Sequence, residues 1–364
     1  MTEGPSTTFE AVISAGEAPR KRRSSSTAAM AKRLGLRLVA AEELSIRRRG
    51  AGKGFYYQAP DGSRIKDPET LKRLASLAVP PAYTDVVYAE DPNAHLQAVG
   101  RDAAGRLQYR YHPEWEKVRE ARKAKRLGRL VQSLPRIRRS IAQHLSGQAP
   151  TRELALAAVI ELVARSAIRA GREAYAKERG TRGAATLLKS NVKVNGETIT
   201  LAFRAKGGKD VHKEISAPRL CAALEVLRKV PGRRMFQYVD ADGETRVVRA
   251  RDVNAFLRSL AGVGISLKDF RTLCASAAVL DALARALPSS SQRGRRKQVL
   301  EAVRAAAEEL HNTPTICRKS YVHETVVHAF EKGVLERFSA TLKSCRSLAR
   351  KEQFLAQVIA TASL

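Results

Sequence analysis

Short runs of alternating apolar and polar residues dominate the chain between residues 36 and 112, and Asp, Pro and Gly separate them. This pattern is typical of strands that bury one face and are joined by tight turns. Four strands are predicted in this way, at residues 55–58, 85–88, 95–99 and 107–111. One short helix is expected from Pro68 to Leu77, because Pro80 and Pro81 follow it. We therefore predict a small antiparallel β-sheet domain over residues 36–113.

The pattern changes after Pro113. Residues 116–140 hold ten Lys or Arg and two Glu with weak apolar spacing, which predicts a basic helix or linker. From Arg152 onward, apolar residues recur at the spacing of a helix. We expect a mostly helical domain over residues 114–335 and a helical extension over 336–364. For this extension, packing against the core is favoured over contact with a ligand.

One β segment interrupts the helical half. Val192 to Val194 and Thr198 to Phe203 flank Asn195-Gly196, a strong signal for a tight hairpin. A further strand is predicted from Val211 to Ile215, and helices are expected to resume at Pro218 and to dominate from there to the end. The predicted fold class is α+β, with a small antiparallel β-sheet N-terminal domain followed by a mostly α-helical domain that contains a three-stranded β-meander.

The charge balance is more informative than the apolar content, which is an ordinary 44%. The chain has 66 Lys and Arg against 36 Asp and Glu, a formal net charge of +30. Self-repulsion on that scale is costly unless a polyanion neutralises it, and nucleic acid is the first candidate. A membrane surface is disfavoured because no helix pairs a basic face with a Trp-, Phe- and Leu-rich face. The most apolar stretch, Leu154 to Ile168, is too short to span a bilayer and carries Glu161 and Arg165.

The N-terminal segment and the cysteines indicate the compartment. Residues 1–35 are predicted to form a disordered basic tail, since the first 30 are poor in large apolar groups and include Arg20 to Arg23. The first residues lack the charged-then-apolar pattern of a signal peptide. Four widely spaced cysteines form no CxxC pair and no Cys/His cluster, so no zinc site is predicted. We expect a cytoplasmic protein with reduced thiols.

If the polyanion is nucleic acid, a reaction at its phosphodiester needs three kinds of group. It needs a nucleophile, cations around the non-bridging oxygens and an acid for the leaving oxygen. Arg suits the oxygens through its bidentate fork, and Lys suits the acid because its pKa responds to its surroundings. Taken singly, each candidate also has an ordinary structural role. Tyr321 fits a half-buried helix tyrosine, Arg169 a surface arginine, Arg271 an ion-pair partner of Asp269, and Lys206 a solvated turn lysine.

Read together, several segments resemble the poxvirus-like and bacterial branch of the type IB DNA topoisomerases. The resemblance covers about residues 45 to 335, and its motifs are specific in combination. They are Ala51-Gly-Lys-Gly54, Pro80-Pro-Ala-Tyr83, Gly100-Arg-Asp102, Gly105-Arg-Leu-Gln-Tyr-Arg-Tyr-His-Pro113, Ile168-Arg-Ala-Gly171, Phe236-Gln-Tyr238, Asp252-Val-Asn254, Lys268-Asp-Phe-Arg-Thr272 and Asn312-Thr-Pro-Thr-Ile-Cys-Arg-Lys-Ser-Tyr321.

The resemblance implies a catalytic set. Tyr321 matches the nucleophile that forms a 3′-phosphotyrosyl bond, and Arg169 and Arg271 match the arginines that hold the scissile phosphate. Lys206 matches the general acid at the tip of a hairpin, although Lys209 in the same turn is its rival.

A fifth position is His in some members and Asn in others. The residue nine before the tyrosine is Asn312, whereas His311 is one step out of register, so Asn312 is assigned to this position. An amide donates to a phosphate oxygen but does not titrate, which implies a stabilising role.

The N-terminal sheet matches the family at its DNA-contacting strand. Gln108, Tyr109 and Tyr111 fall on this strand, and the two tyrosines share a face. Core packing is the usual role of paired strand aromatics, but the flanking Arg106 and Arg110, together with the resemblance, favour a DNA-facing surface. A glutamine there suits a base edge in the major groove.

The implied activity is relaxation of supercoiled duplex DNA by transient single-strand cleavage and religation, carried out by a monomer that clamps DNA. No cofactor, ATP or metal is implied. Two alternatives stay open. A tyrosine recombinase shares the Arg–Lys–Arg–Tyr chemistry, but it usually carries His where this chain has Lys268. A non-catalytic architectural DNA-binding protein would explain the charge but not the motifs.

Overall fold

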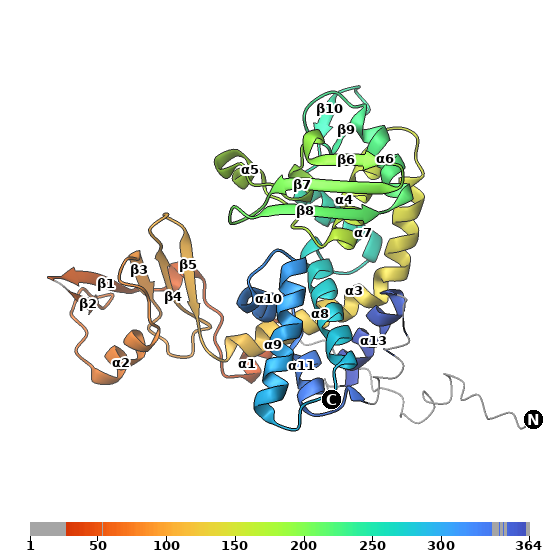
Figure 1. The fold of residues 1–364 in the computed structure, drawn as a ribbon. Coiled ribbons are helices and arrows are strands. Elements are labelled where there is room, and N and C mark those ends of the chain that lie inside the picture. Colours follow the sequence, from red (N-terminus) through yellow and green to blue (C-terminus); the bar gives the residue numbers. More distant parts are fainter. Residues whose placement is uncertain (1–26, 53, 337–341, 343–344, 346–347, 362–364) are drawn as a thin grey trace, which may run out of the picture. The chain divides into compact units, whose positions relative to one another are not determined.

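The structure is a computed structural model, and it describes residues 27–52, 54–336, 342, 345 and 348–361 (Figure 1). The chain divides into two compact units, the N-terminal unit Met1–Arg119 and the C-terminal unit Glu120–Leu364, and each is described by itself. Across the described ranges, no helix combines the length and apolar composition that crossing a membrane requires.

The N-terminal unit is built on a five-stranded antiparallel sheet with the order β2-β1-β3-β4-β5. Its strands are β1 (Ile46–Ala51), β2 (Gly54–Gln58), β3 (Thr84–Tyr88), β4 (Leu96–Arg101) and β5 (Leu107–Tyr111). The sequence analysis missed β1, because three consecutive arginines hide any apolar alternation. The strand forms because it pairs on both sides, with β2 and with β3.

A short helix and the sheet share a small core in this unit. Helix α2 (Pro68–Ser76) begins where the Asp67 side chain accepts a hydrogen bond from the Thr70 amide, and it ends one residue before the predicted Leu77. Leu74 of this helix packs with Ile46, Val86, Tyr88 and Ala98 of the sheet.

Within the range predicted as a disordered tail, Thr27–Arg33 forms helix α1, and residues 1–26 lie outside the described residues. Ala31 of α1 and Leu36 pack against Trp115 and Val118, in the first turn of helix α3 (Trp115–Leu145). The basic segment predicted as helix or linker is therefore a helix of 31 residues, and its first turn belongs to the core of the N-terminal unit.

In the C-terminal unit, helix α4 (Arg152–Ser166) lies at the centre of the core. Leu154 to Ile160 are all buried, so every side of this helix is covered rather than one stripe. Helices α6 (Pro218–Arg228), α7 (Ala250–Ala261) and α8 (Leu267–Arg285) contact it. The other described helices of this unit are α5 (Glu173–Arg179), α9 (Gln292–Glu309), α10 (Pro314–Ser320), α11 (Glu324–Glu331) and α13 (Leu348–Thr361), with 3-10 turns at Ala184–Thr186 and Lys189–Asn191. In the N-terminal unit, a 3-10 turn spans Ala41–Glu43.

The predicted three-stranded meander is confirmed. Strands β6 (Val192–Asn195), β7 (Thr198–Arg204) and β8 (Asp210–Ser216) form one antiparallel sheet beside α4 and α6 (Figure 1). Ile199, Leu201 and Phe203 point into the core, as their alternation predicts. The α+β fold class is therefore confirmed in both of its parts.

Helices dominate after Pro218, as predicted, but one short hairpin that was not predicted interrupts them. Strands β9 (Gln237–Val239) and β10 (Thr245–Val247) form a second, two-stranded sheet. Each strand has only three residues, too few to show a period in the sequence. The hairpin is set by its turn, because the Asp240 carboxylate accepts hydrogen bonds from the amides of Asp242 and Glu244 and from the Arg246 side chain.

The last described helix closes the core of this unit. Phe354, Leu355 and Val358 of α13 are buried in it. The buried Glu352 carboxylate accepts two hydrogen bonds from Arg138 of α3, at 2.9 and 2.7 Å. These contacts give α13 a packing role.

Candidate active site

A cavity of about 490 Å³ in the C-terminal unit brings together side chains that are distant in the sequence. Arg169, Lys206, Arg271 and Tyr321 line it. The fifth predicted residue, Asn312, lies beside them, because its Oδ1 accepts a hydrogen bond from the Arg169 guanidinium. The structure thus gathers all five residues that the sequence analysis selected for catalysis.

Arg169 is held by a close contact between two backbone segments. Helix α4 ends at Ala167 in the left-handed conformation, and the chain then turns past residues 183–185. The amides of Ala184 and Ala185 donate to the carbonyls of Arg169 and Ala170, both at 2.8 Å. Gly183 makes this approach possible, since a Cβ on it would lie 2.5 Å from the Arg169 carbonyl oxygen.

Arg271 is almost completely buried, with 3% of its surface exposed. It lies in the second turn of α8, and its guanidinium donates to the carbonyls of Ala167 and Leu310. These bonds fix the guanidinium between the end of α4 and the end of α9. Its Nε is buried and has no hydrogen-bond partner among the described residues. A buried, unpaired donor is costly, so an incoming oxygen acceptor would satisfy it.

Tyr321 ends helix α10, and its ring lies beneath two cations. The Arg271 guanidinium carbon is 4.8 Å from the ring centroid and the Lys268 ammonium is 5.7 Å from it. Burial alone raises the pKa of the Tyr321 hydroxyl, but Arg271, Arg169 and Lys268 outweigh it, and the pKa is lowered from its ordinary value of 10.0. The site therefore favours the phenolate, the form that acts as a nucleophile.

Asn312 follows a sharp backbone turn between α9 and α10, in which His311 takes a left-handed φ of 49°. Asn312 is 8% exposed, and its amide nitrogen has no partner within the part of the chain that the structure describes. With its oxygen bonded to Arg169, the amide nitrogen remains available as a donor. Burial and the nearby Lys213 lower the pKa of His311 below its ordinary value, which disfavours the charged imidazolium.

Lys206 and Lys209 occupy the same turn between β7 and β8, which the hydrogen bond from the Ala205 amide to the Lys209 carbonyl closes at 2.7 Å. Lys206 lines the cavity with Tyr321, whereas Lys209 is not among the described residues that line it. The geometry thus favours Lys206 over its rival.

The sequence analysis missed several cations at this site. It considered Lys268 only as the position where recombinases carry His, yet Lys268 lines the cavity and lies over the Tyr321 ring. Arg172 and Arg182 also line the cavity. Their sole signal in the sequence is a high local density of arginine, which does not single out any one position.

A second, larger hollow of about 810 Å³ shares Gly171, Arg172, Ala250 and Asn254 with the cavity. Its other basic lining residues are Lys177, Arg234, Arg249 and Arg251. The cavity therefore opens beside a basic surface that suits a polyanion longer than a single phosphate.

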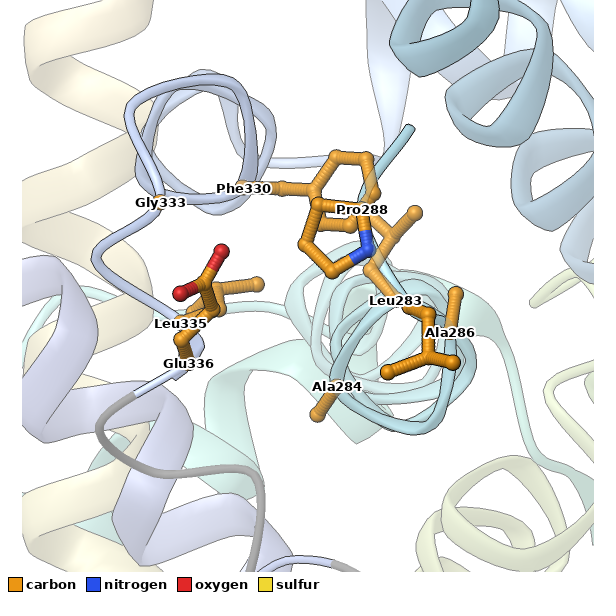
Figure 2. A pocket seen from close by; sticks show the side chains of 9 residues that line it. Leu283, Ala284, Ala286, Pro288, Phe330, Gly333, Leu335 and Glu336 are labelled. Carbon is orange, nitrogen blue, oxygen red and sulfur yellow. The ribbon is translucent and has the colours of Figure 1, made fainter. Parts of the chain in front are cut away.

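A third cavity, of about 360 Å³, is of a different kind (Figure 2). Leu283 of α8, Phe330 of α11 and Leu335, in the turn after α11, line it, and Glu336 is its one carboxylate. It contains none of the five predicted catalytic residues.

In the N-terminal unit, Tyr109 and Tyr111 lie on the edge strand β5 with their rings stacked, 6.2 Å apart and 19° from parallel. They are 44% and 41% exposed, so they do not serve as core residues. Asp102 accepts hydrogen bonds from Arg106 and Gln108. The bond from Arg106 is the main cause that holds the pKa of Asp102 below its usual range.

The remaining residue of the predicted DNA-contacting set is Arg110, whose guanidinium donates to the carbonyl of Ala78 at 3.0 Å. Together these contacts leave an exposed aromatic strand flanked by basic side chains. Such a surface suits stacking and phosphate contacts.

Comparison with known proteins assigns the family. Residues 112–348 match the family model described as eukaryotic DNA topoisomerase I, catalytic core, and residues 54–102 match the bacterial DNA topoisomerase IB N-terminal domain. The chain is 29% identical over 295 residues to DNA topoisomerase 1B of Acanthamoeba polyphaga mimivirus, across 79% of this chain and 88% of the relative. It is 24% identical over 282 residues to DNA topoisomerase 1B of vaccinia virus (strain Copenhagen), across 76% and 87%. Because the first match covers well over half of the sequence, the chain belongs to the type IB DNA topoisomerases, the DNA-binding isomerases of this family.

Proposed function

We propose that this topoisomerase relaxes supercoiled duplex DNA by cutting one strand through Tyr321 and resealing it. The observation that carries the proposal is the cavity in which a phenol, two guanidinium groups and an ammonium group meet. Separately, each of these side chains has an ordinary structural explanation. Their convergence from a loop after α4, a β-turn, α8 and the end of α10 has no such explanation.

In the first step, the Tyr321 oxygen attacks the phosphorus of a DNA phosphodiester. The bond from phosphorus to the 5′-oxygen breaks as the bond to the phenol oxygen forms, which leaves a 3′-phosphotyrosyl link. Arg169 and Arg271 donate to the non-bridging oxygens, and the unpaired amide nitrogen of Asn312 donates to one of them. Lys206 gives its proton to the departing 5′-oxygen.

The free end then swivels under torsional strain. The 5′-hydroxyl attacks the phosphorus and returns its proton to Lys206, and the bond from phosphorus to the Tyr321 oxygen breaks, which restores the strand. The covalent link conserves the energy of the phosphodiester, so the cycle requires no ATP. Guanidinium groups supply the charge that stabilises the phosphorane, so the proposed cycle requires no metal ion. We propose further that a monomer carries out this cycle.

The N-terminal unit is proposed to hold the duplex through β5. Tyr109 and Tyr111 offer exposed ring faces. In this proposal the Gln108 amide reaches a base edge, and Arg106 and Arg110 contact phosphates. Phosphate neutralisation then dominates affinity, and log K falls with log salt by roughly 0.9 per contacted phosphate.

The central test is relaxation of supercoiled plasmid in EDTA without nucleotide, with wild type beside Tyr321→Phe. Wild type is expected to relax the plasmid and to leave a covalent protein–DNA adduct after denaturation, while Tyr321→Phe does neither. An adduct in Tyr321→Phe would show that another residue is the nucleophile. Activity only on plasmids with paired recombination sites would favour a recombinase instead.

A second test isolates the general acid. Lys206→Ala is compared with Lys209→Ala on a normal duplex and on one whose scissile 5′-oxygen is replaced by sulfur. A thiolate leaves without a proton, so the sulfur substrate is expected to restore cleavage by Lys206→Ala. Lys209→Ala is expected to cleave both substrates at similar rates. A defect in Lys209→Ala that sulfur relieves would transfer the role to Lys209.

A further inference from the structure

The peptide units directly after Tyr321 are held from two sides. Ser276 of α8 is fully buried, and its hydroxyl donates to the Tyr321 carbonyl at 3.0 Å while it accepts from the His323 amide at 3.0 Å. On the other side, the Lys123 ammonium of α3 donates to the Val322 carbonyl at 2.9 Å. It also approaches the Lys319 carbonyl at 3.5 Å.

Lys123 is an unusual residue for such a place. Its side chain is only 14% exposed, and Glu120 on the same helix pairs with it at 2.8 Å. A buried ammonium is retained at low cost only when its donors are satisfied. Here they are satisfied by Glu120, by the Val322 carbonyl just after α10 and by the Lys319 carbonyl in its last turn, where helix carbonyls lack partners within the helix. The ammonium thereby fixes the last turn of the helix that carries Tyr321.

One turn later, a second cation of α3 binds the end of a helix that carries a catalytic candidate. Arg126 donates to the Asp269 carboxylate at 2.8 Å and to the Ser266 hydroxyl at 2.9 Å. Asp269 also accepts from the Ser266 amide, so these residues form the cap at the start of α8. Arg271 follows two residues later on α8.

The same helix therefore contacts the elements that carry the nucleophile and one phosphate-binding arginine. Residues three apart lie on one face of a helix, so Lys123 and Arg126 act together. The first turn of α3 is packed in the core of the N-terminal unit through Trp115 and Val118. Val118 and Lys123 are separated by five residues of continuous helix, roughly 7.5 Å of rise.

We propose that Lys123 and Arg126 are positioning residues, and that α3 sets the placement of Tyr321 and Arg271. Because α3 is one continuous helix, a restraint on the turn before Lys123 reaches both catalytic elements through these two side chains. The inference rests on the proposed roles of Tyr321 and Arg271. A displacement of the nucleophile by about 1 Å is sufficient to lower a rate about 100-fold.

The test uses the full chain and single-turnover cleavage of a duplex oligonucleotide at saturating protein. Lys123→Met removes the ammonium, and Arg122→Met is the matched control, since it removes the same charge from an exposed position on the same turn. Lys123→Met is expected to slow cleavage about 10- to 100-fold with unchanged DNA affinity. Arg122→Met is expected to cleave at the wild-type rate. Arg126→Met tests the second contact, and it serves alone if Lys123→Met does not fold.

Two further measurements separate positioning from other roles. The sulfur-substituted duplex is expected to leave the Lys123→Met defect in place, because the defect lies in attack and not in protonation of the leaving group. Arg122→Gly weakens the helix between its first turn and Lys123, because glycine has a low helix propensity. It is expected to slow cleavage at saturating DNA, although Arg122→Met does not.

The outcomes that overturn the inference are distinct from those that overturn the proposed function. Wild-type cleavage rates in both Lys123→Met and Arg126→Met would refute positioning. Weaker DNA binding that is equal in Lys123→Met and Arg122→Met, with no change in rate at saturation, would make Lys123 a phosphate contact. Equal rates in Arg122→Gly and Arg122→Met would refute transmission along α3. An adduct in Tyr321→Phe would instead refute the proposed nucleophile, whatever Lys123 does.

Discussion

Gly183→Ala is the smallest change that we expect to disable the site, although Gly183 touches none of the reacting atoms. Its φ is ordinary, so alanine adds no backbone strain of its own. The effect is steric. The added Cβ would lie 2.5 Å from the Arg169 carbonyl oxygen, and 2.6 and 2.7 Å from the amide nitrogen and Cα of Gly171. All three atoms belong to backbone, which does not swing aside as the end of a side chain does.

The magnitude follows from these distances. Ordinary contact begins at about 3.4 Å, so the two segments must separate by roughly 0.9 Å at the Arg169 carbonyl. Overpacking of this kind destabilises proteins by about 1–3 kcal/mol. The separation would stretch the hydrogen bonds that Ala184 and Ala185 donate to residues 169 and 170. A shift of nearly 1 Å in Arg169 corresponds to a loss of about 100-fold in cleavage rate.

The assay pairs single-turnover cleavage with thermal unfolding, and Gly128→Ala is the control. Gly128 lies within α3, and a Cβ added to it would meet nothing within 4 Å, so alanine there is expected to leave cleavage unchanged and to stabilise the helix by about 1 kcal/mol. Gly183→Ala is expected to cleave slowly even well below its unfolding temperature. If Gly183→Ala instead cleaves at the wild-type rate, the contact beneath Arg169 does not position it, and the reasoning fails.

Three further predictions concern single side chains. The Tyr321 hydroxyl is expected to titrate below 10.0 in the free protein, and Lys268→Met is expected to raise its pKa. Each titration is measured as the difference in tyrosinate absorbance between a protein with Tyr321 and the same protein with Tyr321→Phe. A midpoint above 10.0 in the wild type would contradict the balance of burial and cations given above. Asn312→Ala is expected to lower the cleavage rate about 10²–10³-fold. Because an amide does not titrate, the pH–rate profile is expected to keep its shape. A profile shifted along the pH axis would indicate that Asn312 acts through an ionisable neighbour. His323→Asn is expected to reduce the acid sensitivity of folding, because burial lowers the pKa of His323 to about 4 from 6.5. The neutral form is favoured in the folded state, so the contribution of this group to stability is complete above about pH 6.5 and is lost as the pH falls towards 4, by up to about 3 kcal/mol. Asparagine retains the cap that His323 provides to the Thr325 amide, so denaturant unfolding at neutral and acid pH isolates the titration, and equal acid losses in both proteins would refute it.

The identity of the catalytic candidates could be obtained from the sequence. Tyr321, Arg169, Arg271 and Lys206 were each selected from short motifs in a fixed order, and the structure places all four around one cavity. Asn312 was chosen over His311 by its spacing from Tyr321, and Asn312 is the residue that contacts Arg169. Taken singly, none of these residues stands out in the sequence, and the motifs identify them only through their combined resemblance to the type IB DNA topoisomerases.

Much of the secondary structure could also be predicted, because it depends on neighbours in the sequence. Asn195-Gly196 closes the hairpin between β6 and β7, and the alternation from Ile199 to Phe203 sets its buried face. Strand β1 escaped prediction because its pairing with β2 and β3, and not its own pattern, makes it a strand.

Tertiary structure alone decided how the catalytic groups are held and tuned. The contact of Gly183 with Arg169 joins two loops, and the hydrogen bond from Lys123 to Val322 spans 199 positions of the chain. The lowered pKa of Tyr321 likewise arises from cations on α8 and on the loop after α4. A local pattern specifies which residues lie on one face of an element, but it does not specify which other element will cover that face. The sequence therefore determined which groups we propose as the reacting ones, whereas packing between distant segments determined their geometry and charge.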